Sequence, residues 1–131
     1  FLPEPEIHFG PHVAVPDLAG WRSERLSQDA IKKAFIEIAP DWICEVLSPS
    51  TEKYDKGDKL RIYALYGVDH IWFVDPRVKS LEVFKRQDKD WVLKHSFFEN
   101  DDVSAPPFDV LTFKLGLLWP FDPPSEPAAT T

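Results

Sequence analysis

Two acidic residues, Asp17 and Glu45, occupy positions where a carboxylate either destabilises the fold or takes part in catalysis. Glu45 interrupts the apolar run of residues 41–47, on the face that a strand would share with Ile43 and Leu47. A carboxylate buried there loses its hydration, which makes the charged form energetically unfavourable unless a cation or hydrogen bonds replace the water. Asp17 follows a proline at the end of an earlier β-prone run. Two carboxylates on neighbouring strands converge on a hard divalent ion such as Mg²⁺, which prefers oxygen ligands.

Such an ion would equip the chain for phosphate chemistry. It polarises a phosphate group and supplies hydroxide, while a nearby lysine offsets the negative charge that develops during attack. The residues therefore indicate a site made of Asp17, Glu45 and a lysine, with Mg²⁺ or Mn²⁺ as the cofactor. A structural interpretation stays open beside it, in which Glu45 forms an ion pair with a lysine and Asp17 is a turn residue.

Other common sites are absent from the sequence. The chain has no G-x-S-x-G, G-x-x-x-x-G-K-[ST] or G-x-G-x-x-G motif, which argues against serine hydrolases, P-loop enzymes and dinucleotide-binding proteins. His70 and His95 lack cysteines or carboxylates at the spacing of zinc ligands, and Gly10-Pro11 breaks any helix that could align His8 with His12. Trp21, beside Arg22 and Arg25 in a polar segment, is a candidate for a nucleic-acid or partner contact or for simple packing. The single cysteine, Cys44, cannot form an internal disulfide, and this fits a reducing cytoplasm.

Charge limits the partners. The chain has 22 acidic and 15 basic residues and therefore a net charge of -7. Proteins that bind nucleic acid nonspecifically are usually basic instead. An enzyme that meets a phosphate through a metal ion is still allowed. No apolar run approaches the roughly 20 residues of a membrane-spanning helix, so we expect no membrane segment.

The acidic residues must be held by a β-sheet. Leu60, Tyr63 and Ala64 recur at helical spacing ahead of Gly67, a residue typical of a helix C-terminus. A strand, this helix and a second strand form a βαβ unit, which implies parallel pairing. The strands expected around and after the helix cover residues 41–47, 71–74, 80–85 and 90–96, with a turn at 87–89.

The ends of the domain are less regular. We expect β-prone runs at residues 4–9 and 13–18, one or two helical turns at 30–37, and a strand or short helix within 108–119. The fold class is α/β (α+β), a mixed β-sheet with one main helix after the Glu45 strand. Residues 1–119 form one domain, and the Pro-rich residues 120–131 read as a tail.

Four linked segments resemble a known family. They are P16-D17-L-A-G-W, A39-P-D-W-I-C-E45-V-L-S-P-S-T, D55-x-x-x-K59-x-x-x-Y63-A and I71-W-F-V-D75-P, in this order. They are similar to a large bacterial family whose members are thought to be endonucleases and which was formerly classed as a domain of unknown function. That family belongs to the restriction-endonuclease-like, or PD-(D/E)xK, superfamily. The resemblance runs from about Pro3 to Trp119.

The resemblance implies divalent-metal-dependent cleavage of phosphodiester bonds, with DNA as substrate. By position, Asp17 matches the acid of the "PD" element and Glu45 the first acid of "(D/E)xK". Leu47 stands where that element has its lysine, and Lys59, on the following helix, is the residue that matches instead. Members of this group begin with an N-terminal helical and hairpin region, so we expect this domain to be N-terminally incomplete.

Three functions follow as hypotheses. The first is an endonuclease in which Asp17 and Glu45 hold Mg²⁺ and Lys59 stabilises the attacked phosphate or orients water. The alternative is a non-catalytic module of the same fold that mediates protein association, including a homodimer formed through an exposed sheet edge. A third is a metal-dependent hydrolase of a smaller phosphate ester.

Overall fold

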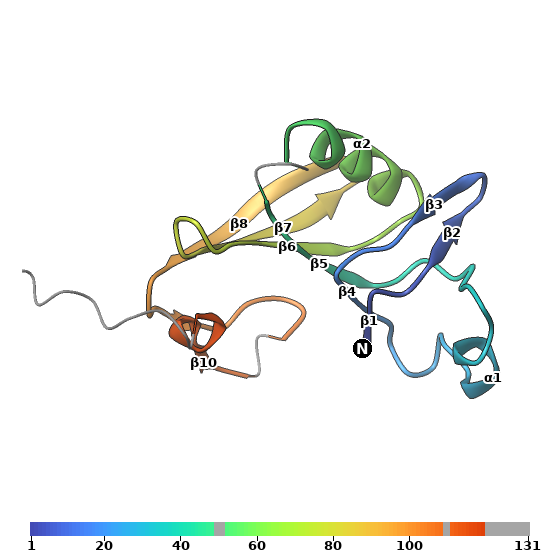
Figure 1. Ribbon diagram of the computed structural model, residues 1–131, viewed down its shortest axis with the longest axis horizontal. Helices are drawn as coiled ribbons and strands as arrows, with labels where there is room; N and C mark the ends of the chain where they lie inside the picture. Colours follow the sequence, from blue (N-terminus) through green and yellow to red (C-terminus); the bar gives the residue numbers. More distant parts are fainter. Residues whose placement is uncertain (49–51, 109–110, 120–131) are drawn as a thin grey trace, which may run out of the picture.

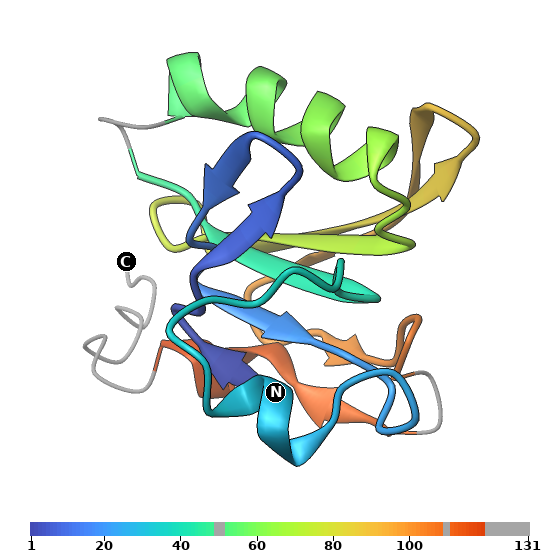
Figure 2. The same ribbon diagram turned by 90° about the vertical axis from the view of Figure 1, so that its right-hand side faces the viewer.

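A mixed β-sheet with one long helix packed on it forms the body of the protein. The structure is a computed structural model that describes residues 1–48, 52–108 and 111–119, and only the backbone of residues 52–56. The expected Pro-rich tail, residues 120–131, lies outside the described residues. Helix α2 (Glu52–Leu65) covers one face of the sheet. The C-terminal segment, including β9 (Asp102–Val103) and β10 (Phe113–Lys114), covers the other (Figures 1 and 2).

The main sheet has six strands in the order β1-β4-β5-β6-β7-β8. Strands β5 and β6 pair in parallel, and the other neighbours pair antiparallel. The expected α+β class, a mixed sheet with one main helix, is confirmed. The strands are β1 (Leu2–Pro3), β4 (Leu18–Gly20), β5 (Trp42–Val46), β6 (His70–Asp75), β7 (Ser80–Gln87) and β8 (Asp90–Phe98).

The parallel pair is joined through α2, as the βαβ pattern predicts. The helix ends at Leu65, and Gly67 follows in the turn with a φ of 81°, which glycine adopts freely but which strains other residues. The amide of Val68 donates to the carbonyl of Tyr63 at 2.9 Å, and the amide of Gly67 donates to that of Ala64 at 3.2 Å. These two bonds satisfy the last helical carbonyls and fix the final turn, which carries Tyr63.

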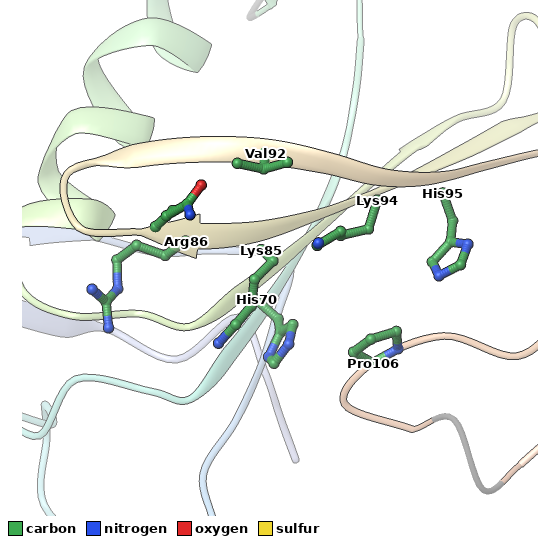
Figure 3. A pocket seen from close by; sticks show the side chains of 8 residues that line it. His70, Lys85, Arg86, Val92, Lys94, His95 and Pro106 are labelled. Atoms are coloured by element: carbon green, nitrogen blue, oxygen red, sulfur yellow. The ribbon is translucent and has the colours of Figure 1, made fainter.

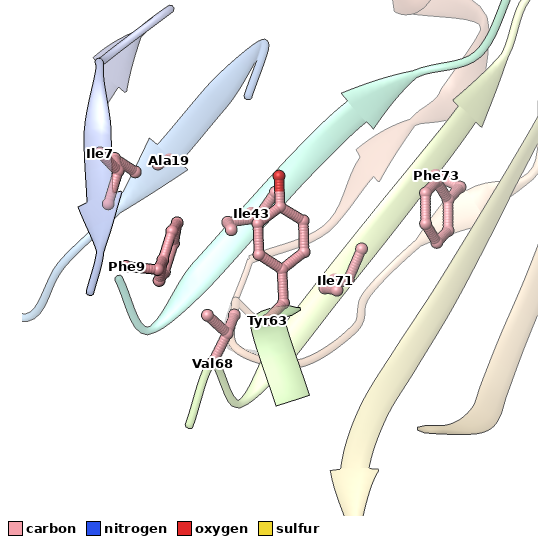
Figure 4. Packing of buried hydrophobic residues seen from close by; sticks show 8 residues of the cluster. All are labelled: Ile7, Phe9, Ala19, Ile43, Tyr63, Val68, Ile71 and Phe73. Atoms are coloured by element: carbon pink, nitrogen blue, oxygen red, sulfur yellow. The ribbon is translucent and has the colours of Figure 1, made fainter. Parts of the chain in front are cut away.

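Alternate residues of the central strands feed two hydrophobic clusters, one on each face. Ile43, Ile71 and Phe73 point toward α2, where Tyr63 is fully buried (Figure 4). On the other face, Trp42 and Trp72 pack beneath the C-terminal segment. The predicted division of β5, with Ile43 and Glu45 on one face and Trp42 on the other, is therefore confirmed.

The ends of the domain differ from the expectation. The run at residues 13–18 is not one strand, because the chain turns at Pro16 and Asp17 between β3 (His12–Ala14) and β4. Strand β3 pairs instead with β2 (Ile7–Phe9) in a separate two-stranded sheet. Helix α1 (Gln28–Ile31) is only one turn long; Ser27 caps it, and it buries no residue. An isolated turn without a buried face has little to stabilise it, so the expected helix at 30–37 stops early.

The C-terminal segment is a string of short elements. It contains β9 (Asp102–Val103), β10 (Phe113–Lys114) and a 3₁₀ turn, η1 (Leu115–Leu118), so residues 108–119 hold both a short strand and a short helix. Buried Val103 and Leu115 anchor it to the sheet. Among the described residues, no helix is both long and apolar enough to cross a membrane.

Candidate active site

Strand pairing brings Asp17 and Glu45 side by side. Leu18 of β4 lies opposite Cys44 of β5 in an antiparallel pair, so the preceding Asp17 falls beside Glu45. The amide of Asp17 donates to Glu45 Oε1 at 3.3 Å. In return, the carboxylate Oδ2 of Asp17 accepts a hydrogen bond from the amide of Val46 at 2.7 Å. The exposed Asp17 side chain thus reaches across to the end of β5.

The other oxygen of Glu45 faces α2. Its Oε2 accepts a hydrogen bond from the Tyr63 hydroxyl at 2.9 Å and lies 3.3 Å from the Lys59 ammonium. Glu45 is 6% exposed, whereas the side chain of Lys59 is 34% exposed. The buried Glu45 carboxylate therefore contacts a lysine side chain that is itself partly exposed to solvent. The structure brings all three predicted residues, Asp17, Glu45 and Lys59, into one connected network.

Helix α2 presents both partners of Glu45 from one face. Lys59 and Tyr63 are four residues apart, and residues at that spacing are neighbours on a helix surface. The buried Tyr63 ring packs against Phe9 with ring centroids 5.6 Å apart, and the C-terminal turn fixes its backbone. The side chain of Asp55, one turn before Lys59, lies outside the described part of the chain.

Burial dominates the electrostatics of Glu45. Loss of hydration raises the pKa of this carboxyl, and the charge of Lys59 and the hydrogen bonds from Tyr63 and Asp17 oppose that rise without cancelling it. The carboxylate form thus lacks enough compensating positive charge. A bound cation would supply it, so the donor set fits a hard divalent ion.

The candidate ligands are few. Within residues 1–48, 52–108 and 111–119, no group of three or more His, Cys, Asp or Glu side chains is arranged to hold a metal. Mg²⁺ commonly uses only one or two protein carboxylates and keeps several waters. Asp17 and Glu45 meet that smaller requirement, and both supply oxygen.

Cys44, the neighbour of Glu45 on the strand, is not a nucleophile here. Burial, followed by the charges of Glu45 and Asp17, raises the pKa of its thiol to about 12. The thiolate is the reactive form of cysteine, so this side chain stays protonated and inert at neutral pH.

Sequence reasoning missed the role of Tyr63, which it took only as an apolar position of the helix. The signal was present in the spacing, since Tyr63 follows Lys59 by one helical turn. The structure also decides between the interpretations of Trp21. Its indole donates to the carbonyl of Ile38 at 2.7 Å and its ring packs against the core under α2, which favours packing.

Replacing Tyr63 by phenylalanine removes one hydrogen bond from a buried acceptor. We expect the free energy of unfolding to fall by about 1–3 kcal/mol, the usual cost of leaving a buried polar group short of a partner. The pKa of Glu45 should rise further, because that hydrogen bond favours the charged form. Urea denaturation of Tyr63→Phe measures the first effect, with Tyr66→Phe, in the turn just after α2, as the matched control. Equal losses in both variants would contradict this role.

The raised pKa of Glu45 also predicts a pH dependence of stability in metal-free protein. Between its unfolded and folded pKa values, the folded state holds a proton that the unfolded state has released. The free energy of unfolding contributed by this group therefore falls as the pH rises through that window. Glu45→Gln cannot titrate, so it should lose less stability than the wild type as the pH rises above the ordinary carboxyl pKa of about 4.3.

Urea denaturation in EDTA at several pH values checks this expectation. The exposed Glu24→Gln is the control and should follow the wild-type curve. If the curves of Glu45→Gln and the wild type run parallel, the pKa of Glu45 is not raised.

The topology of the mixed sheet, with α2 on one face, is that of a restriction-endonuclease-like domain. Comparison with known proteins agrees. Residues 2–116 match the Uma2 family, described as a putative restriction endonuclease, and the chain belongs to this family. The resemblance drawn from the sequence is thereby confirmed.

A solved structure from Anabaena variabilis, described as a putative nuclease belonging to DUF820, has the same fold. It is 24% identical, with a TM-score of 0.71 over 91% of this chain. The present chain spans 66% of that protein's length, just under two thirds. No curated protein matches the sequence.

Proposed function

We propose that this chain is a divalent-metal-dependent endonuclease that hydrolyses phosphodiester bonds in DNA. The observation that carries the proposal is the network in which Glu45, 6% exposed, is contacted by Asp17, Lys59 and Tyr63. Maintaining a charged group there costs free energy that a purely structural site would avoid, whereas metal chemistry uses it. Membership of a family described as restriction endonucleases supports the same reaction class.

Each residue has a distinct part in the proposal. Asp17 and Glu45 would hold Mg²⁺ or Mn²⁺, and the ion, when bound, would polarise the scissile phosphate and lower the pKa of a water molecule. Tyr63 and the amide of Asp17 orient the Glu45 carboxylate. Lys59, partly exposed beside Glu45, would stabilise the negative charge that accumulates on the attacked phosphate.

Cleavage of supercoiled plasmid DNA tests the proposal directly. We expect nicking in Mg²⁺ or Mn²⁺ and none in EDTA. Asp17→Asn keeps an acceptor for the Val46 amide but removes the charge, so cleavage should fall to background with the fold retained. Asp90→Asn, an exposed residue at the start of β8, is the matched control and should cleave normally. Metal-independent cleavage, or full activity in Asp17→Asn, would overturn the proposal.

Association with a second copy of the chain is a further candidate, favoured by the edge of the sheet. Strand β8 is the last of the six strands and exposes Leu93 and Phe98. A long edge strand with exposed apolar residues is prone to pair with another strand. We expect sedimentation to reveal a homodimer that Leu93→Lys shifts to monomer. A wild-type chain that stays monomeric at all concentrations would exclude this role.

A further inference from the structure

A pocket lined by several basic side chains lies on the face of the sheet opposite α2. Its volume is about 540 Å³, within the usual range for small-molecule sites. Strands β6, β7 and β8 form its floor, and the C-terminal segment faces it across the opening (Figure 3). Its lining residues are His70, Lys85, Arg86, Gln87, Val92, Lys94, His95 and Pro106.

Two of the three Lys and Arg side chains that line the pocket form no ion pair among the described residues. The guanidinium of Arg86 is paired with Asp69 at 2.9 Å. Neither Lys85 nor Lys94 has a carboxylate partner in the part of the chain that the structure describes, and no acid is among the lining residues. The acids behind the net charge of -7 act on the pocket only weakly where they lie farther than about 8–10 Å from it, because salt screens charges beyond that distance.

An irregularity in the β7–β8 pair concentrates the basic groups. Val83 pairs with His95 and Phe84 with Leu93, so Lys94 is an extra residue on β8. Consecutive strand residues normally point to opposite faces, and a bulge changes that alternation. Lys94 and His95 consequently both reach the pocket (Figure 3).

The remaining basic groups come from the regular part of the sheet. His70 of β6 pairs directly with Lys85 of β7, which sets the two side chains next to each other on the same face. In Figure 3 the side chains of Lys85, Lys94, His70 and His95 point into one space. Four nitrogen-bearing side chains from three strands thus converge on one pocket, and its two lysines, Lys85 and Lys94, have no carboxylate partner among the described residues.

We propose that this pocket binds a phosphate group. Two unpaired ammonium groups match the charge of a phosphate, for which lysine is a common ligand, and the imidazoles of His70 and His95 offer further donors. The site is separate from the Asp17–Glu45–Lys59 network, which lies on the α2 face three residues further along the strands. The phosphate belongs either to a phosphorylated small molecule or to a nucleic-acid backbone.

Titration of the metal-free protein with inorganic phosphate, followed by amide NMR at constant ionic strength, tests the proposal. We expect saturable shifts of β7 and β8 resonances. Lys85→Gln with Lys94→Gln should weaken binding at least about tenfold, since each lost charged hydrogen bond is worth that much or more. The exposed pair Lys32→Gln with Lys33→Gln removes equal charge elsewhere and should bind like the wild type.

Two further ligands identify the source of the phosphate. A mononucleotide with a 5′-phosphate that binds more tightly than a short oligonucleotide without terminal phosphates indicates a small molecule, and the reverse order indicates a backbone phosphate. Either order supports a phosphate site. Shifts no larger than chloride produces, or equal weakening in both lysine pairs, would overturn it. Because the titration contains no metal, its outcome is independent of the nuclease activity.

Discussion

Glu45→Gln is expected to abolish Mg²⁺ binding and with it DNA cleavage. The substitution preserves the volume of the side chain and an oxygen for the Tyr63 hydroxyl, but it removes the charge that the ion would neutralise. Loss of an outer partner of a metal ligand costs about 10–100-fold in affinity, so loss of a ligand's charge should cost more than about 100-fold. Calorimetric titration of wild type and variant with Mg²⁺ and Mn²⁺ measures the change directly.

The matched control for this experiment is Glu24→Gln, the same chemical change at an exposed position. It should bind and cleave like the wild type. Circular dichroism establishes that Glu45→Gln is folded before its affinity is compared. Undiminished Mg²⁺ affinity in a folded Glu45→Gln protein would place the metal elsewhere and leave Glu45 a structural residue.

Lys59→Met is expected to separate metal binding from catalysis. Methionine keeps an unbranched apolar side chain on α2 but removes the ammonium beside Glu45 Oε2. Removing a single group that stabilises transition-state charge typically slows catalysis by about 10²–10³-fold, and we expect a loss of that size in plasmid cleavage. The metal ligands remain, so Mg²⁺ should still bind at mildly alkaline pH.

The pH dependence of binding refines the assignment. The charge of Lys59 lowers the pKa of Glu45 against the effect of burial, so its loss should raise that pKa further. Protons then compete more strongly with Mg²⁺, and the affinity of Lys59→Met should approach that of the wild type as the pH increases. Lys59→Arg, which restores a cation, should recover part of the activity, whereas the exposed Lys32→Met should change nothing.

These two substitutions distinguish the nuclease from a structural ion pair. In the structural interpretation, Glu45, Lys59 and Tyr63 serve only to satisfy one buried carboxylate. Neither variant would then affect a metal, and both would register only in stability. An active site requires that Glu45→Gln lose the metal and that Lys59→Met keep it while losing cleavage. Equal loss of Mg²⁺ affinity in both variants at every pH would show that Lys59 acts solely through Glu45.

Patterns within single segments determined much of this protein. The alternation along residues 41–47 set Ile43 and Glu45 on one face and Trp42 on the other, and the structure confirms it. The helical spacing of Leu60, Tyr63 and Ala64 predicted α2, and Gly67 predicted its end. Such signals are local, because side-chain direction and helix termination depend on neighbouring residues. The motifs in the same segments sufficed to indicate the family.

Only the tertiary structure decided which distant residues meet. The β4–β5 register places Asp17 beside Glu45, and the packing of α2 aims Lys59 and Tyr63 at the same carboxylate. The β7–β8 bulge similarly turns Lys94 into a pocket that no sequence pattern marks. Register depends on pairing between segments far apart in the chain, and a shift by one residue would reverse every side chain. Sequence patterns therefore identified the candidate residues, whereas strand pairing and helix packing brought them into contact.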